Sequence, residues 1–277
     1  MEQQQIDTIL EMYAKRRALQ KIGQTVGMSP KTIQKWLKDN NHWTGHRSLA
    51  FYYDEFFFDK IDTEEKAYWL GFIYADGYLT TDRNTIGIEL KASDASHLEK
   101  FRNTLQSEHE VKIYHKNSTF GPQDNARFTF RSKHMHTILL SYYKSPNKTF
   151  EGHFPIDFVP EFLQHHFIRG FFDGDGSISM GVSTMKEGNL YKFQLSFIGQ
   201  KKTLEMIEKL SGFSWNWSQR YPERETDNWQ IQNGRVNECL TFLDYMYHDA
   251  TVFLDRKYQR YQAIISNRET YKAKARV

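Results

Sequence analysis

Two acidic residues, Asp76 and Asp175, stand at the same place in two copies of one short pattern. Residues 69–77 read WLGFIYADG and residues 168–176 read IRGFFDGDG, so each acid follows an apolar stretch and precedes a glycine. The acids are 99 residues apart, about the size of a small domain. Two carboxylates held close together repel each other unless a cation lies between them. Their hard oxygen ligands favour Mg²⁺, so we expect a metal site completed by one acid from each copy.

Each acid closes a predicted helix. Residues 64–75 and 160–174 are apolar enough to pack a helix face, and the glycine after each acid is expected to allow the turn into a strand. Each helix also has two small residues four positions apart, on one face, which would let two helix backbones approach closely. These small residues are Gly71, Ala75, Gly170 and Gly174.

After each motif the apolar pattern changes to a period of two, which predicts strands. The predicted strands cover residues 85–93, 111–116, 126–132, 177–183, 191–198, 214–220 and 228–233. The predicted helices between and after them cover residues 95–106, 133–143, 201–211 and 236–249. Each half therefore reads helix, two strands, helix, two strands, helix.

One face of these strands is rich in hydroxyl, amide and charged side chains. An ordinary solvated sheet face is the alternative, since antiparallel sheets often have one wet side. Amides and basic groups on so many strands favour DNA, because they read base edges and neutralise phosphates. The candidate DNA-binding residues are Thr80, Glu89, Lys91, Lys112, Tyr114, Lys116, Arg127, Thr129, Arg131, Ser177, Ser179, Ser183, Lys192, Gln194, Ser196, Asn216, Ser218, Arg220, Gln230 and Gln232.

The two motif copies and the order of elements after them resemble those of the LAGLIDADG homing endonucleases, over residues 60–265. The first copy departs from the family at Tyr74, where an Asp is common, and the second keeps Asp173. The resemblance implies an α+β fold class with two pseudo-symmetric αββαββα half-domains that form a DNA-binding saddle. It also implies a monomer that cuts both strands of double-stranded DNA at a long target site, in intron homing. Mg²⁺ would be the cofactor, with Mn²⁺ or Ca²⁺ as substitutes in binding.

By the same resemblance, Asp76 and Asp175 are metal ligands and catalytic residues, and Ala75 and Gly174 complete the metal site. The DGDG string of the second copy also admits a calcium loop. Such a loop needs a closing glutamate, and this chain has Thr184 at that position. Two unrelated helices that each end in a capping aspartate are the other alternative. The matched order of elements after both copies favours the shared site.

Four further residues, Asp94, Gln200, Lys148 and Lys257, are implied as helpers of catalysis. Asp94 and Gln200 each precede a predicted helix, where the family has a polar residue that positions the attacking water. A helix N-cap is the competing role for Asp94. The segments SPNKTF and ATVFLDRKY contain Lys148 and Lys257, which would stabilise charge on the phosphate or polarise water. A surface lysine is the alternative for both.

The first 40 residues predict a separate helical unit. Seven Lys and Arg there oppose four Asp and Glu, a net charge of +3. Apolar residues recur at helical spacing around a short turn with Gly27, and Pro30 lies near the start of the next helix. The pattern resembles a recombinase-type helix-turn-helix, although helical pairs without a DNA-binding role are common. The residues that the second helix would present to DNA are Lys31, Thr32, Gln34 and Lys35.

The predicted organisation has four segments. They are a helix-turn-helix domain (residues 1–40), a connector (41–60) and two half-domains (61–150 and 151–277). Composition fits a cytoplasmic protein, because the single cysteine, Cys239, excludes an internal disulfide framework. No apolar run is long enough to predict a membrane span. The start at Met1, and an end without a His-Asn pair, favour a free-standing protein over an intein.

We therefore predict a sequence-specific, Mg²⁺-dependent DNA endonuclease. Two other functions remain open on the same scaffold. One is a transcription regulator without catalysis, against which the presence of both Asp76 and Asp175 speaks. The other is an intron-splicing maturase that binds RNA on the saddle, against which the DNA-like helix-turn-helix is mild evidence. The net charge of +3 and isoelectric point of 8.7 are only mildly basic and do not by themselves identify a DNA-binding protein; the placement of Lys and Arg on the strands does more.

Overall fold

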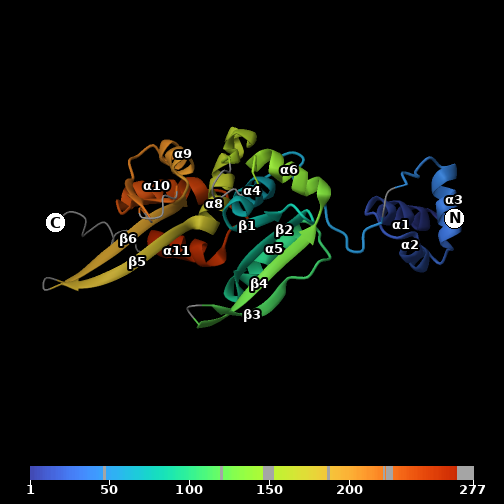
Figure 1. Cartoon of the computed structure of the whole chain (residues 1–277), viewed down its shortest axis with the longest axis horizontal. Coiled ribbons are helices and arrows are strands. Elements are labelled where there is room, and N and C mark those ends of the chain that lie inside the picture. The colour runs from blue at the N-terminus through green and yellow to red at the C-terminus, as the bar shows by residue number, and fades with distance from the viewer. Residues whose placement is uncertain are drawn as a thin grey trace. The chain divides into compact units, whose positions relative to one another are not determined.

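The computed structural model of the chain contains two compact units (Figure 1). The first comprises Met1–Asp54 with Arg102–Glu110, and the second comprises Glu55–Phe101 with Val111–Val277. The structure describes residues 1–45, 48–118, 121–145, 153–185, 188–220, 222 and 227–266. The predicted division into four segments stays a prediction.

Three short helices form the start of the first unit: α1 (Gln3–Ala14), α2 (Leu19–Val26) and α3 (Pro30–Asp39). Between α2 and α3, Gly27 has a φ of +72°, a left-handed conformation that favours glycine. The Ser29 hydroxyl then accepts from the Thr32 N–H at 3.1 Å and caps α3. The buried core of this unit contains Ile9, Tyr13, Ile22, Ile33 and Leu37.

Glu108 connects segments of the first unit that are far apart in the sequence. Both oxygens of Glu108 accept from the Arg17 guanidinium. The Tyr52 N–H also donates to Glu108, at 3.0 Å. The Tyr52 ring lies 5.6 Å from the Lys15 ammonium and 5.6 Å from the Arg17 guanidinium, within cation–π range. Tyr52 of the predicted connector is thus packed within this unit, whereas Phe56, Phe57 and Phe58 of the connector belong to the second unit.

The second unit begins with one four-stranded antiparallel sheet, in the order β1-β2-β4-β3. Its elements are α4 (Glu64–Asp76), β1 (Gly77–Thr80), β2 (Thr85–Lys91), the 3₁₀ turn η1 (Ala92–Asp94), α5 (Ala95–Thr104), β3 (Lys112–Ser118), β4 (Gly121–Arg131) and α6 (Lys133–Tyr143). Phe128 and Ile88 lie on its apolar face, where the Phe128 ring meets Phe101 of α5 at 5.7 Å.

A second four-stranded antiparallel sheet follows, in the order β5-β6-β8-β7. Its elements are the 3₁₀ turns η2 (Pro155–Phe158) and η3 (Glu161–Leu163), then α8 (Gln164–Asp175), β5 (Gly176–Met185), β6 (Gly188–Gly199), α9 (Lys201–Ser211), β7 (Asn216–Gln219), β8 (Trp229–Asn233), α10 (Val236–Tyr247) and α11 (Asp255–Ser266). Phe197 of β6 contacts Trp215 and Phe242 on its apolar face.

The predicted strands and helices all have counterparts in the structure, with shifted ends. Strand β4 begins at Gly121, before the predicted alternation, because its polar start pairs with β3. The helix predicted from residue 160 begins at Gln164, after Pro160 and a 3₁₀ turn. Helix α11 is absent from the predictions, since it is a polar helix with few apolar positions.

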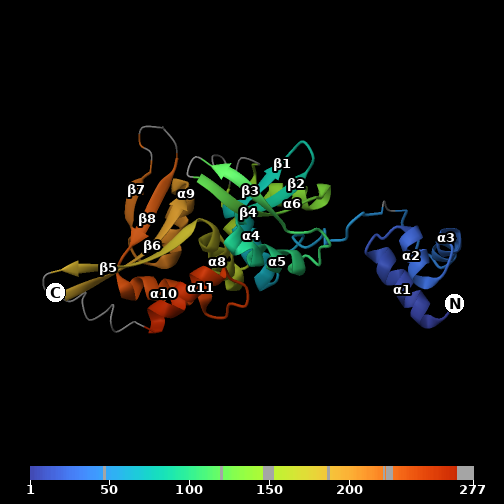
Figure 2. The ribbon, with the colours of Figure 1, turned by 90° about the horizontal axis from the view of Figure 1, so that it is seen from below.

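Helices α4 and α8 lie side by side between the two sheets (Figures 1 and 2). Glycine makes this approach possible. A Cβ atom on Gly71 would lie 2.1 Å from the Phe167 carbonyl oxygen, and one on Gly170 would lie 2.0 Å from the Tyr68 carbonyl oxygen. The predicted close packing of the two helix backbones is therefore present.

The glycines after the two acids have a different role from the one predicted. Gly77 and Gly176 have φ of −79° and −85°, extended backbone that any residue adopts. Glycine is required at both positions because neighbouring atoms leave no room for a Cβ atom. A Cβ atom on Gly77 would lie 2.6 Å from the Ile73 carbonyl oxygen, and one on Gly176 would lie 2.0 Å from the Phe172 ring.

The helix contact gives a first testable prediction. We expect Gly71→Ala to lower the free energy of unfolding by about 1–3 kcal/mol or more, because the new methyl group meets backbone rather than a movable side chain. Gly181→Ala is the control, since no atom lies within 4 Å of its added Cβ. Urea unfolding of both variants measures the difference. Equal stability of the two variants would contradict the close helix contact.

Candidate functional site

Asp76 and Asp175 are the last residues of α4 and α8, and the helix contact brings them together. A Cβ atom on Gly174 would lie 2.3 Å from Ala75 Cβ and 3.4 Å from Asp76 Cγ. Both aspartates are partly exposed. The charges of both raise the pKa of the same ammonium group, that of Lys257. The two helix ends therefore place two carboxylates in one neighbourhood.

Lys257 lies beneath this point, at the C-terminal end of α8. Its side chain is 2% exposed. The Nζ atom donates to the carbonyl oxygens of Phe172 (2.5 Å), Asp173 (2.8 Å) and Gly176 (2.5 Å), with that of Gly174 farther off at 3.4 Å. Burial lowers the pKa of Lys257 to about 8, although nearby carboxylates raise it. The ammonium thus satisfies carbonyls that lack helical partners.

Asp173 is a fully buried carboxylate next to Lys257. It accepts from the hydroxyls of Tyr68 (2.8 Å) and Tyr247 (2.9 Å) and from the Leu254 N–H (2.7 Å). Burial raises its pKa, while the Lys257 charge and these hydrogen bonds lower it. The sequence pattern assigned no role to Asp173. The two motif copies differ at this position, with Tyr74 in the first copy, and that difference could have indicated a role specific to the second copy.

Arg169 is a second buried charge that sequence reasoning missed, because it stands inside an apolar run. It is fully buried and donates to the carbonyl oxygens of Val252 (2.9 Å) and Met246 (2.7 Å) and to Glu64 (2.6 Å). Glu64 also accepts from the Thr251 N–H at 2.7 Å. Glu64 and Arg169 thus bind the backbone that leads from α10 to α11.

The same segment also reaches the first sheet's elements. Lys100 of α5 donates to the Phe253 carbonyl at 2.9 Å and to Asp255 at 2.6 Å. Arg256 donates through Nε to Asp94 at 2.9 Å. Residues 251–257, named the strap here, are therefore held by side chains from both halves of the second unit. The strap places Lys257 at the end of α8.

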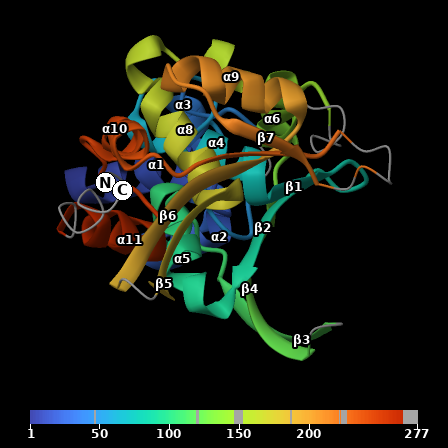
Figure 3. The same ribbon diagram turned by 90° about the vertical axis from the view of Figure 1, so that its left-hand side faces the viewer.

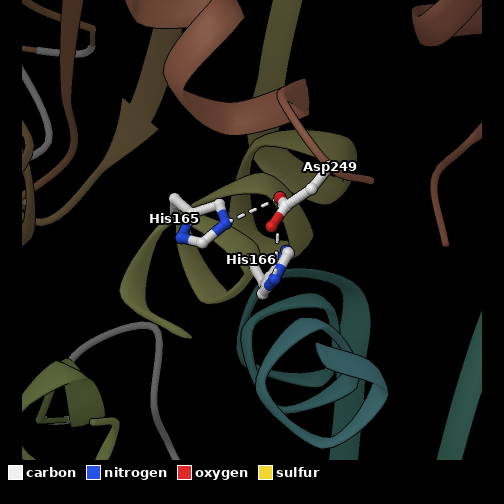
Figure 4. Close-up of side chains that lie close together, drawn as sticks. All are labelled: His165, His166 and Asp249. Atoms are coloured by element: carbon white, nitrogen blue, oxygen red, sulfur yellow. Dashed lines mark hydrogen bonds and ion pairs between the residues drawn. The ribbon is translucent and has the colours of Figure 1, made fainter. Parts of the chain in front are cut away.

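His165, His166 and Asp249 form a cluster beside the start of α8 (Figure 4). His165 Nε2 lies 2.9 Å from Asp249, and His166 Nε2 lies 3.8 Å from the same oxygen. The two rings lie 3.8 Å apart. Spacing alone would admit a metal ion at this cluster.

Hydrogen bonding argues against a metal ion there. Nη1 of Arg169 donates to His166 Nδ1 at 2.8 Å, and a guanidinium has no acceptor. The proton of a neutral His166 ring is therefore on Nε2, which then offers no lone pair to a metal. Burial, and then the Arg169 charge, lower the pKa of His166 to about 4. The hydrogen bonds of His165 to Asp249 and of Arg169 to His166, with the contact between the two tilted rings, therefore account for the cluster.

The predicted helpers occupy different surroundings. Asp94 is 9% exposed and ends η1, where its partner is Arg256. Gln200 is the N-cap residue of α9, without a side-chain capping bond. Lys148 lies outside the described residues, as do the side chains of Lys116, Ser183 and Lys192.

The polar face of the first sheet carries charged side chains. Glu89 of β2 and Lys112 of β3 are the register partners of Arg127 in β4. Glu89 and Arg127 form an ion pair of 2.8 Å. Six candidates on this face are at least partly exposed beside that pair: Thr80, Lys91, Lys112, Tyr114, Thr129 and Arg131.

The polar face of the second sheet carries hydroxyls and amides. Ser177, Ser196, Gln232 and Asn216 are successive register partners across its four strands. Ser196 is 6% exposed, so it lies beneath its neighbours rather than open to solvent. The Gln194 amide donates to Gln232 at 2.9 Å. The exposed or partly exposed candidates are Ser177, Ser179, Gln194, Asn216, Ser218, Arg220, Gln230 and Gln232.

In the first unit, the candidate residues of α3 lie at its surface. Lys31, Thr32 and Lys35 are exposed and Gln34 is partly buried. The Thr32 hydroxyl is hydrogen-bonded to Ser29 at 2.7 Å. Two lysines one helical turn apart leave a basic edge on this helix.

The fold is that of the LAGLIDADG homing endonucleases. I-LtrWI, solved bound to target DNA, matches with a TM-score of 0.51 and 14% identity over 75% of this chain and 92% of that one. I-GzeII, in complex with its DNA target, gives 0.50 and 13% over 74% and 91%. I-SmaMI, bound to uncleaved DNA with calcium ions, gives 0.50 and 10% over 74% and 92%. No protein-family model and no curated protein sequence matches the chain.

Among the described residues, no helix has the length and apolar character that crossing a membrane requires.

His97, beneath α4, gives a pH-dependent prediction. Burial, and then the charges of Lys100, Arg256 and Lys257, lower its pKa to about 3. As the pH falls, His97 is therefore protonated in the unfolded chain before it is protonated in the folded chain. The free energy of unfolding decreases as the pH falls from about 6.5 towards the folded pKa, by ~1.4 kcal/mol per pH unit. His97→Gln should remove that part of the slope in denaturant unfolding between pH 4 and 7. Parallel curves for the two proteins would contradict it.

Proposed function

We propose that this chain is a sequence-specific, Mg²⁺-dependent endonuclease that cuts both strands of DNA. The observation that carries the proposal is the meeting of Asp76 and Asp175 at the paired ends of α4 and α8. The similar structures of I-LtrWI and I-GzeII, each solved with target DNA, support DNA as the partner. Intron homing is the biological role that we infer with it.

The residues at the helix ends suit a divalent cation. Two carboxylates there add to the negative ends of two helix dipoles, so a cation is favoured. Asp76 and Asp175 would hold Mg²⁺, with Ala75 and Gly174 contributing at the same helix ends, and oxygen donors are those that Mg²⁺ prefers. When bound, Mg²⁺ supplies an activated water and neutralises charge on the phosphate. I-SmaMI was solved in the presence of calcium ions, and calcium is a divalent cation that also prefers oxygen ligands.

Lys257 supports this site by ordering it. An ammonium has three protons, and Phe172, Asp173 and Gly176 accept from it at 2.5–2.8 Å. The Lys257 cation therefore fixes the backbone on both sides of Asp175. Lys148 is proposed as the partner lysine of the first half. Asp94, which accepts a hydrogen bond from Arg256, and Gln200 remain the candidates for positioning water.

The two polar sheet faces would bind the DNA. Lysines such as Lys112 suit phosphates, and arginines and amides suit base edges. We also propose that the first unit is a helix-turn-helix whose α3 adds phosphate contacts through Lys31 and Lys35. We also infer a long target site and a monomeric protein, because one chain provides both polar faces. Cleavage separates this function from a regulator, and DNA preference over RNA separates it from a maturase.

Removal of either metal-binding charge tests the active site. We expect Asp76→Asn and Asp175→Asn each to abolish double-strand cleavage and to leave DNA binding within a few-fold, because few phosphate contacts change. Cleavage and binding of a selected target, with and without Mg²⁺, measure both effects. Asp157→Asn, at an exposed aspartate of η2, is the matched control and should cleave normally. Full cleavage by Asp175→Asn would overturn the site assignment.

The basic edge of α3 gives a prediction about salt. Lys31→Ala combined with Lys35→Ala should weaken DNA binding without stopping cleavage at saturating DNA. Two phosphate contacts are lost, so the slope of log K against log salt should become shallower by about 1.8. Lys209→Ala, at an exposed lysine in the last turn of α9, is the control. An unchanged slope would show that α3 makes no phosphate contacts.

A further inference from the structure

Five side chains on the first sheet form one continuous hydrogen-bonded chain. Gln123 donates to Asn125 at 2.8 Å, and Asn125 donates to Glu89 at 2.9 Å. Arg127 donates to Glu89 through Nε at 3.2 Å and Nη2 at 2.8 Å, and through Nη2 to the Tyr114 hydroxyl at 2.9 Å. The chain crosses β2, β4 and β3, so its members are fixed relative to the sheet.

Arg127 is held in one orientation by this chain. Its guanidinium lies 4.7 Å from the Tyr114 ring centroid, in cation–π contact. The Glu89 hydrogen bonds raise its pKa. The side chain is still 42% exposed. Among the described residues, no acceptor is bonded to Nη1, and the Tyr114 hydroxyl, which accepts from Arg127, keeps its own proton to donate.

Nη1 of Arg127 and the Tyr114 hydroxyl are therefore two neighbouring donors available to a ligand. In the major groove, guanine presents two adjacent acceptors, O6 and N7, whereas adenine pairs an acceptor with a donor. Phosphate also accepts, but Glu89 lies 2.8 Å from the guanidinium and its negative charge repels a phosphate. Lys112, across β3 from Arg127 and exposed, has the charge suited to a phosphate. The pair Arg127 and Glu89 suits a neutral base edge.

We propose that Arg127, braced by Glu89 and assisted by Tyr114, reads a guanine in the half of the target that the first sheet contacts. The inference rests on the proposed DNA-binding function, and it names one base that the protein recognises and the residue that recognises it. The second sheet offers an amide pair, Gln194 and Gln232, in place of a braced arginine. The two halves of the target are therefore read by different chemistry, and the target is asymmetric.

The test is selection of bound sites from randomised double-stranded DNA by the full chain, without Mg²⁺, so that binding alone is measured. Arg127→Gln should lose the preference for guanine at one position of the target. A good bidentate contact is worth ~1–3 kcal/mol, about 5- to 150-fold in preference. Other positions should keep their preferences, and the salt slope should stay within about 0.3 of wild type. Glu89→Gln should weaken the same guanine preference, because Arg127 loses its brace.

Lys112→Gln is the matched comparison on the neighbouring strand. As a phosphate contact, it should weaken binding to all sequences alike and make the salt slope shallower by about 0.9. If Arg127→Gln behaves like Lys112→Gln, or if Glu89→Gln strengthens binding to all sequences, Arg127 contacts phosphate and the inference is wrong. An unchanged selected sequence would also overturn it.

Tyr114→Phe keeps the ring and removes only the hydroxyl, so it tests the same position if Arg127→Gln fails to fold. It should reduce the same guanine preference by a smaller factor, and no change would remove Tyr114 from the reading pair. Suppose that the wild-type protein selects a target and cuts it, but the position that depends on Arg127 is not a guanine. That result would reject this inference and leave the proposed function standing. Wild-type protein that selects no sequence would reject the proposed function as well.

Discussion

The contact between α4 and α8 is the constraint on which the rest of the second unit depends. The carbonyl oxygens of Phe167 and Tyr68 occupy the space that a side chain at Gly71 or Gly170 would need. This close approach of the two backbones brings the ends of the helices together, and with them Asp76 and Asp175. It also places the starts of the two sheets, because β1 and β5 begin directly after those residues; α4 and α8 are seen next to each other in Figure 3.

Beneath that contact the two halves differ. The second helix end is held by two buried charges, Asp173 and Lys257, together with the strap. The first has Tyr74 in place of Asp173, and its ring packs on Tyr143 and Phe154 instead. Buried charges cost desolvation energy, which is offset only when hydrogen bonds satisfy their lone pairs and protons. Here three donors satisfy Asp173 and three short hydrogen bonds satisfy Lys257, which makes this end the more rigidly specified of the two.

The sheet faces differ in the same sense. The first combines acid, base and aromatic groups in a network that fixes each side chain, whereas the second presents mainly hydroxyls and amides. A fixed side chain loses little conformational entropy when it binds, so the first face is suited to discrimination at few positions. Amides that donate and accept suit contacts with more than one base.

The sequence by itself determined the elements, the repeated motif and the glycines that allow two helices to touch, because these depend on periodicity and on residue size at fixed spacing. It also predicted which strand faces are polar, from alternation alone. Only the tertiary structure decided what binds the buried charges. Arg169, Glu64 and Asp173 take partners from the strap, at least 81 residues away in the chain. Such pairings follow from the path of the backbone after all helices have packed, and no local pattern encodes them.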